Sequence, residues 1–469
     1  MVTKEWIQEQ KSARNNVSFQ KALSPTNDAR TLIMALENLS KLPDGFDGSL
    51  FLPLLKHPSS DIRLLSVKNL GKLKDKSFFD VVCEFARRER NTLVRREAVS
   101  TIGRMRTKQA IPILTEFLWD EDPKVVLQAI RALLCFKESS EVSGVLIQLA
   151  EHPNELIQDT IEREFGSKRK EKSKDVNHAQ SPNFLKNILV YGDVREVLKY
   201  VPNESIHLTF TSPPYYNARD YTIYKSYKEY LQFLVSVFKE VHRITKEGRF
   251  FVLNTSPVII PRMSRSHSST RYLIPFDIHP LLTEIGWEFI EDIIWVKPGP
   301  SVKNRNGGFF QHRKPLGYKA NSVSEYVIVY RKKTDKLIDW NMRQYPDEVV
   351  NQSKIKGDYE RTNIWEITPA CDNVHPAIFP KELAARIIQF YSFKGDLVFD
   401  PYAGIGTVGQ AALMLERYFF LVEQEKEYVK RATTLLNDGL LFCNKLPKTY
   451  FLEQFAETRF LGENGFLTE

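Results

Sequence analysis

A repeat of about 32 residues constrains this 469-residue chain more than any other feature, because it sets the architecture of residues 30–165. Four similar helical patterns open at aliphatic anchors that are 32, 31 and 32 residues apart: Ile62, Val94, Val125 and Ile157. An apolar residue recurs eight positions after each anchor, at Leu70, Ile102, Leu133 and Phe165. Turn-like clusters precede the patterns and supply helix N-caps. The spacing predicts stacked helix pairs, and an irregular helical bundle with chance spacing is the alternative.

Residues 1–165 are therefore expected to form an all-α, HEAT-like solenoid. The next segment, residues 166–174, holds five basic residues and no apolar one. Such a segment cannot bury a core, so we expect a basic flexible linker over residues 166–183.

From residue 184 the pattern changes to short β-rich runs that alternate with helical patterns. Strands are expected at 188–191, 206–211, 249–254, 289–296, 326–330, 397–400 and 418–422. This alternation predicts a doubly wound, Rossmann-like α/β sheet, in which ligands bind at the carboxyl ends of the strands.

A rigid polar motif, Thr211-Ser212-Pro213-Pro214-Tyr215, stands at one such strand end. Proline fixes φ near about −65° and lacks an N–H, so Pro213 and Pro214 offer fixed carbonyl acceptors. A hydroxyl, a carbonyl and a ring face together suit a flat heterocycle that carries an exocyclic amine. Taken alone, the motif is also compatible with a simple turn.

A glycine-containing loop follows a second strand end. Residues 401–409 lie between the expected strand 397–400 and a helix, and they include Gly404 and Gly406. Glycines in a strand-to-helix turn let a ligand approach the backbone, and the helix N-terminus favours negative groups. The next strand ends in Glu423, whose carboxylate can accept both hydroxyls of a ribose. The loop lacks the three-glycine dinucleotide fingerprint, so a nucleoside with an amino-acid tail suits it better than a nicotinamide cofactor.

Four motifs in a fixed order carry a resemblance over residues 184–440: TSPPYYNARDY, IIWVKP, HPAIFPKEL and DPYAGIGTVGQAAL. This order resembles the circularly permuted β group of DNA amino-methyltransferases, the N4-cytosine and N6-adenine family. The resemblance implies a permuted methyltransferase sheet at 184–445, with a specificity region at about 299–374 and a C-terminal tail at 446–469. It also implies the catalytic residues Ser212, Pro213, Pro214 and Tyr215. Ser212 and the Pro213 carbonyl would accept hydrogen bonds from the target amine, and Tyr215 would stack on the flipped base.

The implied cofactor is S-adenosylmethionine. The residues expected to bind it are Asp193, Phe379, Pro380, Asp400, Tyr402, Ala403, Gly404, Gly406, Thr407 and Glu423. The glycine loop would bound the methionine end and Glu423 the ribose, while Asp193 would reach the adenine ring or simply cap a helix. Tyr402 stands where the family more often has Phe. His375 is expected to cap or pack.

The first residue of the tetrapeptide indicates the target base. Ser212 resembles the cytosine-modifying members, whereas the adenine enzymes usually have Asp or Asn there, so N4-cytosine is favoured over N6-adenine. Two acid-free stretches within 255–276 and 293–324 suit phosphate contacts with double-stranded DNA, with solvated loops as the alternative. The DNA-binding candidates are Arg262, Arg265, Lys297, Lys303, Arg305, Arg313, Lys314 and Lys319. Lys297 is better explained as a plain strand-end lysine than as a catalytic residue.

The remaining expectations concern location and partners. A formal net charge of +8 gives a modest preference for polyanions. Four scattered cysteines without a CxxC pair indicate a reducing cytoplasm and no metal, and no export signal or membrane span is expected. The favoured function is the modification component of a restriction–modification system, with a cognate restriction endonuclease as a partner. Methylation of RNA or protein, or a non-catalytic HEAT-type nucleic-acid-binding scaffold, are the alternatives.

Overall fold

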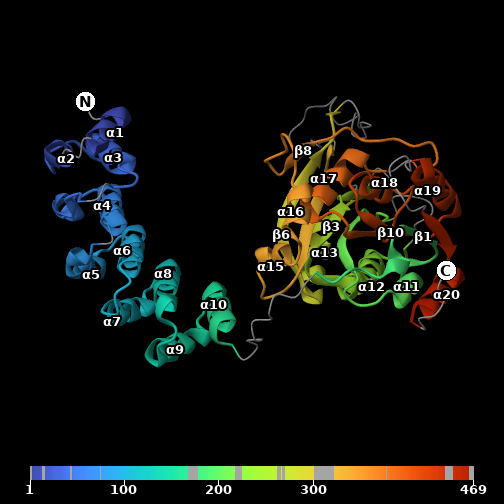
Figure 1. Cartoon of the computed structure of the whole chain (residues 1–469), viewed down its shortest axis with the longest axis horizontal. Helices are drawn as coiled ribbons and strands as arrows, with labels where there is room; N and C mark the ends of the chain where they lie inside the picture. Colours follow the sequence, from blue (N-terminus) through green and yellow to red (C-terminus); the bar gives the residue numbers. More distant parts are fainter. Residues whose placement is uncertain are drawn as a thin grey trace. The chain divides into compact units, whose positions relative to one another are not determined.

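The computed structural model describes residues 3–12, 16–42, 45–73, 75–166, 178–216, 224–260, 266, 270–299, 322–375, 378–438 and 447–463. The chain forms two units, Met1–Lys172 and Ser173–Glu469 (Figure 1). Among these described residues, no helix combines the length and the apolar character that crossing a membrane requires.

The first unit is helical throughout its described part. Its helices are α1 (Lys4–Ser12), α2 (Asn16–Ala22), α3 (Ala29–Asn38), α4 (Ser60–Leu73), α5 (Phe79–Arg88), α6 (Thr92–Arg104), α7 (Ala110–Glu116), α8 (Pro123–Leu133), α9 (Ser140–Ile147) and α10 (Glu155–Phe165). Helices α4, α6, α8 and α10 pack in succession, and α5, α7 and α9 alternate with them along the chain (Figure 1). The four repeat anchors lie one in each of α4, α6, α8 and α10, and all four are fully buried. The predicted solenoid is confirmed.

Polar residues of the turn clusters start these helices and join successive repeats. Asn91, Asp122 and Asn154 each accept a hydrogen bond from a first-turn backbone N–H, which satisfies a donor that the helix itself leaves unpaired. Arg95 of α6 forms a two-pronged ion pair with Asp120, with its Nε 2.7 Å from Oδ2. This largely buried pair ties α6 to the turn that precedes α8.

The second unit is built on a nine-stranded sheet in the order β11-β1-β10-β9-β2-β3-β7-β6-β8. Its strands are β1 (Ile188–Tyr191), β2 (Ile206–Thr211), β3 (Thr245–Thr255), β6 (Trp287–Val296), β7 (Ser324–Lys332), β8 (Ile364–Glu366), β9 (Leu397–Asp400), β10 (Tyr418–Glu423) and β11 (Lys448–Phe451). Neighbours from β11 to β3 pair in parallel, whereas β7 is antiparallel to both β3 and β6. A separate hairpin consists of β4 (Val258–Ile260) and β5 (Thr270–Tyr272).

Alternating side chains of the strands supply two apolar layers, one on each face of the sheet. In β9, Leu397 and Phe399 pack into one layer and Val398 into the other. Helices α11, α12, α13 and α20 cover the first face, and α17, α18 and α19 cover the second (Figure 1). The helices of this unit are α11 (Val194–Val197), α12 (Tyr227–Ile244), α13 (Ile274–Ile285), α15 (Ile338–Arg343), α16 (Asp347–Ser353), α17 (Lys381–Tyr391), α18 (Thr407–Met414), α19 (Lys426–Asp438) and α20 (Leu452–Glu463). The predicted doubly wound α/β class is confirmed.

Two of the expected boundaries, those of the tail and the linker, differ in the structure. Part of the C-terminal tail 446–469 belongs to the sheet instead, since β11 pairs with β1 and Phe455 of α20 is fully buried against the Phe420 ring. Covering the edge of β1 explains this, because an unpaired edge strand exposes a row of backbone donors and acceptors. Residues 324–332, within the expected specificity region, form β7, as the strand expected at 326–330 predicts. The end of the expected linker is anchored, since the Ser181 hydroxyl donates to the Ser205 carbonyl at 2.6 Å.

Candidate active site

The two motif-bearing strands, β2 and β9, are parallel neighbours at the centre of the sheet. From β9 the chain runs through α18 to β10 on one side, and from β2 it runs through α12 to β3 on the other. The strand order therefore reverses between β9 and β2, and a crevice at their carboxyl ends is the expected ligand site. The Thr211 hydroxyl donates to Oδ1 of Asp400 at 2.6 Å, so motifs 189 residues apart in sequence are in direct contact.

Asp400 is a buried carboxylate with spare acceptor capacity. Its Oδ1 accepts from Thr211 and from the Tyr402 N–H at 3.1 Å, while Oδ2 has no partner among the described residues. Burial raises the pKa of Asp400 to about 7, although these two hydrogen bonds lower it. The Tyr402 hydroxyl is also buried without a partner in the described part of the chain. An unpaired carboxylate oxygen of this kind fits the ammonium or hydroxyl of a ligand.

The glycine loop has the backbone that the sequence predicts for close ligand approach. Gly404 and Gly406 have φ of +54° and +79°, a region that L side chains rarely adopt. A Cβ at Gly404 would lie 3.3 Å from the His375 ring, so His375 packs over this loop as expected. Ala403 and Thr407 are buried beside the glycines.

Glu423 ends β10 and closes the other side of the loop. Its Oε2 accepts from the Gly404 N–H at 2.7 Å, and its Oε1 accepts from the N–H groups of Gln424 and Glu425, both at 2.8 Å. Burial nevertheless raises the pKa of Glu423 to about 7. Each carboxylate oxygen has two lone pairs, so two backbone amides on Oε1 and one on Oε2 leave room for a hydroxyl donor. Its contact with a ribose stays a prediction.

The remaining cofactor candidates lie at the margins of this crevice. The Phe379 ring is 4.9 Å from that of Phe210 in β2, and Pro380 directly precedes α17. Asp193 accepts from the Arg195 N–H at 2.8 Å and pairs with the Arg195 guanidinium at 2.6 Å. Asp193 therefore caps α11, the simpler of its two expected roles, and its contact with adenine stays a prediction.

The tetrapeptide is tied to two residues that the sequence did not indicate, Asn254 and Glu325. The Tyr215 hydroxyl donates to Glu325 Oε2 at 2.9 Å, and Asn254 Nδ2 donates to Glu325 Oε2 at 2.7 Å and to Ser212 Oγ at 3.2 Å. Asn254 lies near the end of β3, and Glu325 lies near the start of antiparallel β7, so both are at the carboxyl edge of the parallel strands. Their position at that edge is the signal that could have found them.

Lys297 joins the same cluster through an ion pair with Glu325 Oε1, and its ammonium lies 4.6 Å from the Trp295 ring centroid. These contacts are compatible with a strand-end lysine, and its contact with DNA stays a prediction. Seven other DNA-binding candidates lie outside the described residues: Arg262, Arg265, Lys303, Arg305, Arg313, Lys314 and Lys319.

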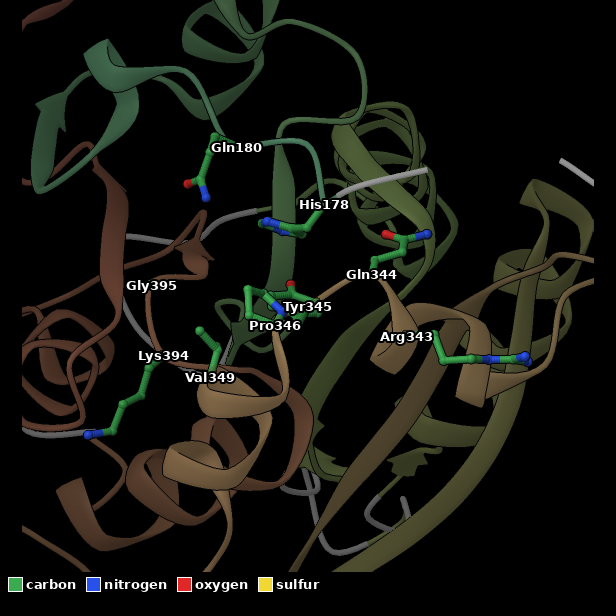
Figure 2. A pocket seen from close by; sticks show the side chains of 9 residues that line it. All are labelled: His178, Gln180, Arg343, Gln344, Tyr345, Pro346, Val349, Lys394 and Gly395. Atoms are coloured by element: carbon green, nitrogen blue, oxygen red, sulfur yellow. The ribbon is translucent and has the colours of Figure 1, made fainter. Parts of the chain in front are cut away.

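A second polar cluster occupies the opposite, amino end of β2 and β9, beside a cavity of about 470 Å³. His178 and His207 share a hydrogen bond of 2.6 Å between their Nε2 atoms, and both lie near Asp396. Figure 2 shows the His178 and Tyr345 rings beside one another, with the charged ends of Arg343 and Lys394 directed away. The two imidazoles and the Asp396 carboxylate could in principle hold a metal ion. The Arg249 guanidinium already pairs with Asp396 and opposes a further cation there, so the cluster is best explained as a structural network.

Comparison with known proteins gives two family matches. Residues 206–434 match a DNA methylase family model, and residues 49–135 match a HEAT repeat model. The chain is 26% identical over 301 residues to the type II methyltransferase M.BglII of Bacillus subtilis, covering 60% of this chain and 78% of M.BglII. It is 27% identical over 260 residues to the DNA adenine methyltransferase YhdJ of Escherichia coli, covering 52% and 80%.

Among solved structures, TTHA0409 of Thermus thermophilus complexed with S-adenosyl-L-methionine is 27% identical, with a TM-score of 0.42 and coverage of 56% of this chain and 96% of TTHA0409. Both motif-bearing strands, the glycine loop and Glu423 fall within the methylase match. Through residues 206–434 the chain belongs to the DNA methylase family, and it is a DNA methyltransferase with a HEAT-repeat unit preceding its catalytic unit.

Proposed function

We propose that this enzyme methylates the exocyclic N4 amine of cytosine in duplex DNA, with S-adenosylmethionine as the methyl donor. The contact between Thr211 and Asp400 carries the proposal, because it joins the tetrapeptide and the glycine loop in one crevice. S-adenosylmethionine supplies, when bound, a methyl group on a positively charged sulfur. The two strand ends can thus hold a methyl donor and an amine side by side, and proximity is a large part of the catalysis that such a transfer needs.

Each half of the crevice has its own task. Asp400, with its unpaired Oδ2, would hold the ammonium of the donor, and the remaining acceptor position on Glu423 Oε2 would hold one ribose hydroxyl. Ser212 Oγ and the Pro213 carbonyl would accept hydrogen bonds from the target amine, which directs the nitrogen lone pair towards the donor. Tyr215 would stack on a base that has been flipped out of the duplex, since a base within the helix cannot reach such a crevice.

Cytosine is favoured over adenine because a serine opens the tetrapeptide. Its hydroxyl is a weaker acceptor than the carboxylate or amide that adenine enzymes usually carry there. Asn254 donates a hydrogen bond to Ser212 Oγ, which leaves one lone pair of that oxygen for the target amine of either base. N6-adenine methylation is the second candidate, favoured by the similarity to YhdJ.

The biological setting follows from the relatives and from charge. M.BglII is a type II methyltransferase, and we propose that this chain likewise protects DNA against a cognate restriction endonuclease. Lys297 and the basic residues at 262–265 and 303–319 are proposed to contact DNA phosphates and bases.

The test is transfer of tritiated methyl groups from S-adenosylmethionine to mixed duplex DNA, followed by nucleoside analysis. We expect labelled N4-methylcytosine from the wild type and greatly reduced label from Pro213→Ala and Tyr215→Ala. Glu84→Gln changes an exposed side chain of α5 in the first unit; it is the control and should retain full activity. N6-methyladenine would overturn the choice of base, label in RNA alone would overturn the substrate class, and no label from any nucleic acid would favour a non-catalytic scaffold.

A further inference from the structure

The Glu325 carboxylate contacts residues at the ends of three strands, β2, β3 and β6, beside the proposed base site. Because β7 is antiparallel to its neighbours, its start lies beside the ends of β3 and β6, with Trp295 opposite Glu325 in the pairing. The carboxylate accepts hydrogen bonds from the Tyr215 hydroxyl, the Asn254 amide and the Lys297 ammonium. No other carboxylate in the described part of the chain is bonded to a tetrapeptide side chain.

The donors and acceptors in this cluster have one consistent arrangement. Burial, and then the charge of Glu325, raises the pKa of Tyr215 well above its usual value. The phenol therefore stays protonated and donates a hydrogen bond to the carboxylate. An ionised carboxylate only accepts, so the Asn254 side chain must direct its nitrogen, not its oxygen, towards Glu325. The second amide hydrogen then donates to Ser212 Oγ. The orientation of the Ser212 hydroxyl is thus transmitted from Glu325 through Asn254.

The Lys297 ammonium compensates the charge of the Glu325 carboxylate, which is partly buried. The Glu325 side chain is 13% exposed and that of Lys297 is 22% exposed. An uncompensated carboxylate with so little water around it would be costly, whereas a paired and hydrogen-bonded one forms a fixed anchor. The aromatic face of Trp295 further restricts the lysine.

We propose that Glu325 is the positioning residue of the catalytic tetrapeptide, fixing the Tyr215 ring directly and the Ser212 hydroxyl through Asn254. Glu325 does not touch the base in this scheme. The inference rests on the proposed methyl transfer, because it assigns to Glu325 the alignment of the groups that hold the amine. Small displacements of such groups are expensive, since catalysis by proximity depends on near-attack geometry.

A double-mutant cycle tests the proposal with the full-length enzyme. Glu325→Gln, Tyr215→Phe and the double variant are compared by single-turnover methyl transfer at saturating S-adenosylmethionine and by calorimetric measurement of its dissociation constant. We expect Glu325→Gln to slow transfer by about tenfold or more, as loss of a hydrogen bond to a charged group does. The dissociation constant should stay within about twofold. Because Glu325 acts through Tyr215 and Asn254, the two substitutions should not act independently. The fold-loss of rate in the double variant should be much smaller than the product of the two single fold-losses.

A matched control is available on β6. The Tyr391 hydroxyl donates to Glu291 Oε2 at 3.2 Å on the exposed surface, so Glu291→Gln removes the same kind of contact elsewhere in the sheet and should leave transfer unchanged. Unchanged transfer by Glu325→Gln, or independent effects of the two substitutions, would overturn the proposal. If Glu325→Gln does not fold, Glu325→Asp replaces it in the same cycle with the same criteria. Failure of the proposed function is distinguishable, because the wild type itself would then transfer no methyl group to DNA.

Discussion

Asp396 directly precedes the four-residue strand β9 and Asp400 ends it. Both are almost fully buried, but their carboxylates have opposite surroundings. Asp396, at the amino end, pairs with Arg249 and accepts from the Tyr345 hydroxyl at 2.5 Å and the Phe393 N–H at 2.9 Å. Asp400, at the carboxyl end, has no cationic partner among the described residues and keeps one oxygen unpaired.

Their pKa values differ accordingly. Burial alone would raise the pKa of both carboxyls. At Asp396 the charge of Arg249 and the hydrogen bonds from Tyr345 and Phe393 act together with His207 against burial, and the pKa is lowered. The two hydrogen bonds at Asp400 are too weak to do the same, and its pKa rises to about 7. A buried carboxylate whose oxygens are all paired stabilises the fold, whereas a buried carboxylate with an unpaired oxygen can accept a hydrogen bond from a ligand.

The largest effect is expected when the paired aspartate is removed. Asp396→Ala leaves the buried Arg249 guanidinium without its counter-charge, and breaking a buried pair in this way typically costs about 3–5 kcal/mol of unfolding free energy. The measurement is scanning calorimetry of the whole chain, in which the transition that S-adenosylmethionine shifts upward belongs to the catalytic unit. An unaltered midpoint would show that the amino-end network is not structural.

The corresponding change at the other end should alter binding instead of stability. Asp400→Asn keeps the shape of the side chain but removes the charge, and we expect affinity for S-adenosylmethionine to fall by about 10- to 100-fold, the usual worth of a hydrogen bond to a charged group. Stability without ligand should be equal or higher, because a poorly compensated buried charge disappears. Isothermal titration calorimetry measures the first quantity. Wild-type affinity in this variant would remove Asp400 from the cofactor site.

The sequence predicted both ends of this strand only in part. Asp400 could be identified because it stands at a strand end before Gly404 and Gly406, a local pattern with a known physical use. The solenoid was equally accessible, since the apolar anchors such as Ile62 and Val94 repeat within one stretch of chain. Asp396 could not be assigned, because its role depends on Arg249, which is 147 residues away in sequence.

A long separation in sequence likewise conceals the contacts of Glu325 with the tetrapeptide. Glu325 is 110 residues from Tyr215, and only the antiparallel placement of β7 brings the two together. The sequence does not predict strand β11, because three of its four residues are exposed and so short a run gives no strong periodicity. Long-range pairing decided each of these features, and no local pattern reports it.

The contributions of the two aspartates to the free energy of unfolding should change with pH in opposite directions, because the pKa of Asp400 is raised and that of Asp396 is lowered. Because the pKa of Asp400 is raised from 3.8 to about 7, the folded protein binds that proton more tightly than the unfolded chain does. Its contribution to stability therefore declines as pH rises from about 4 to about 7 and is constant above. Glu423 has the same sign, with a pKa also near 7. For Asp396 the pKa is lowered, so its contribution is present above about 4 and is lost as pH falls through the folded value.

Deleting one hydroxyl at each aspartate gives the smallest predicted effects and separates the two roles. Thr211→Val removes a bond that lowers the pKa of Asp400, so more of that carboxyl is protonated at pH 7 and affinity for S-adenosylmethionine should fall by about two- to tenfold there. At pH 8.5 the loss should be smaller, because the carboxyl ionises in both proteins. Tyr345→Phe makes the equivalent deletion at Asp396 and should lower the unfolding midpoint without changing affinity at either pH. Equal losses at both pH values in Thr211→Val would mean that the hydroxyl aligns the carboxylate and does not tune its ionisation.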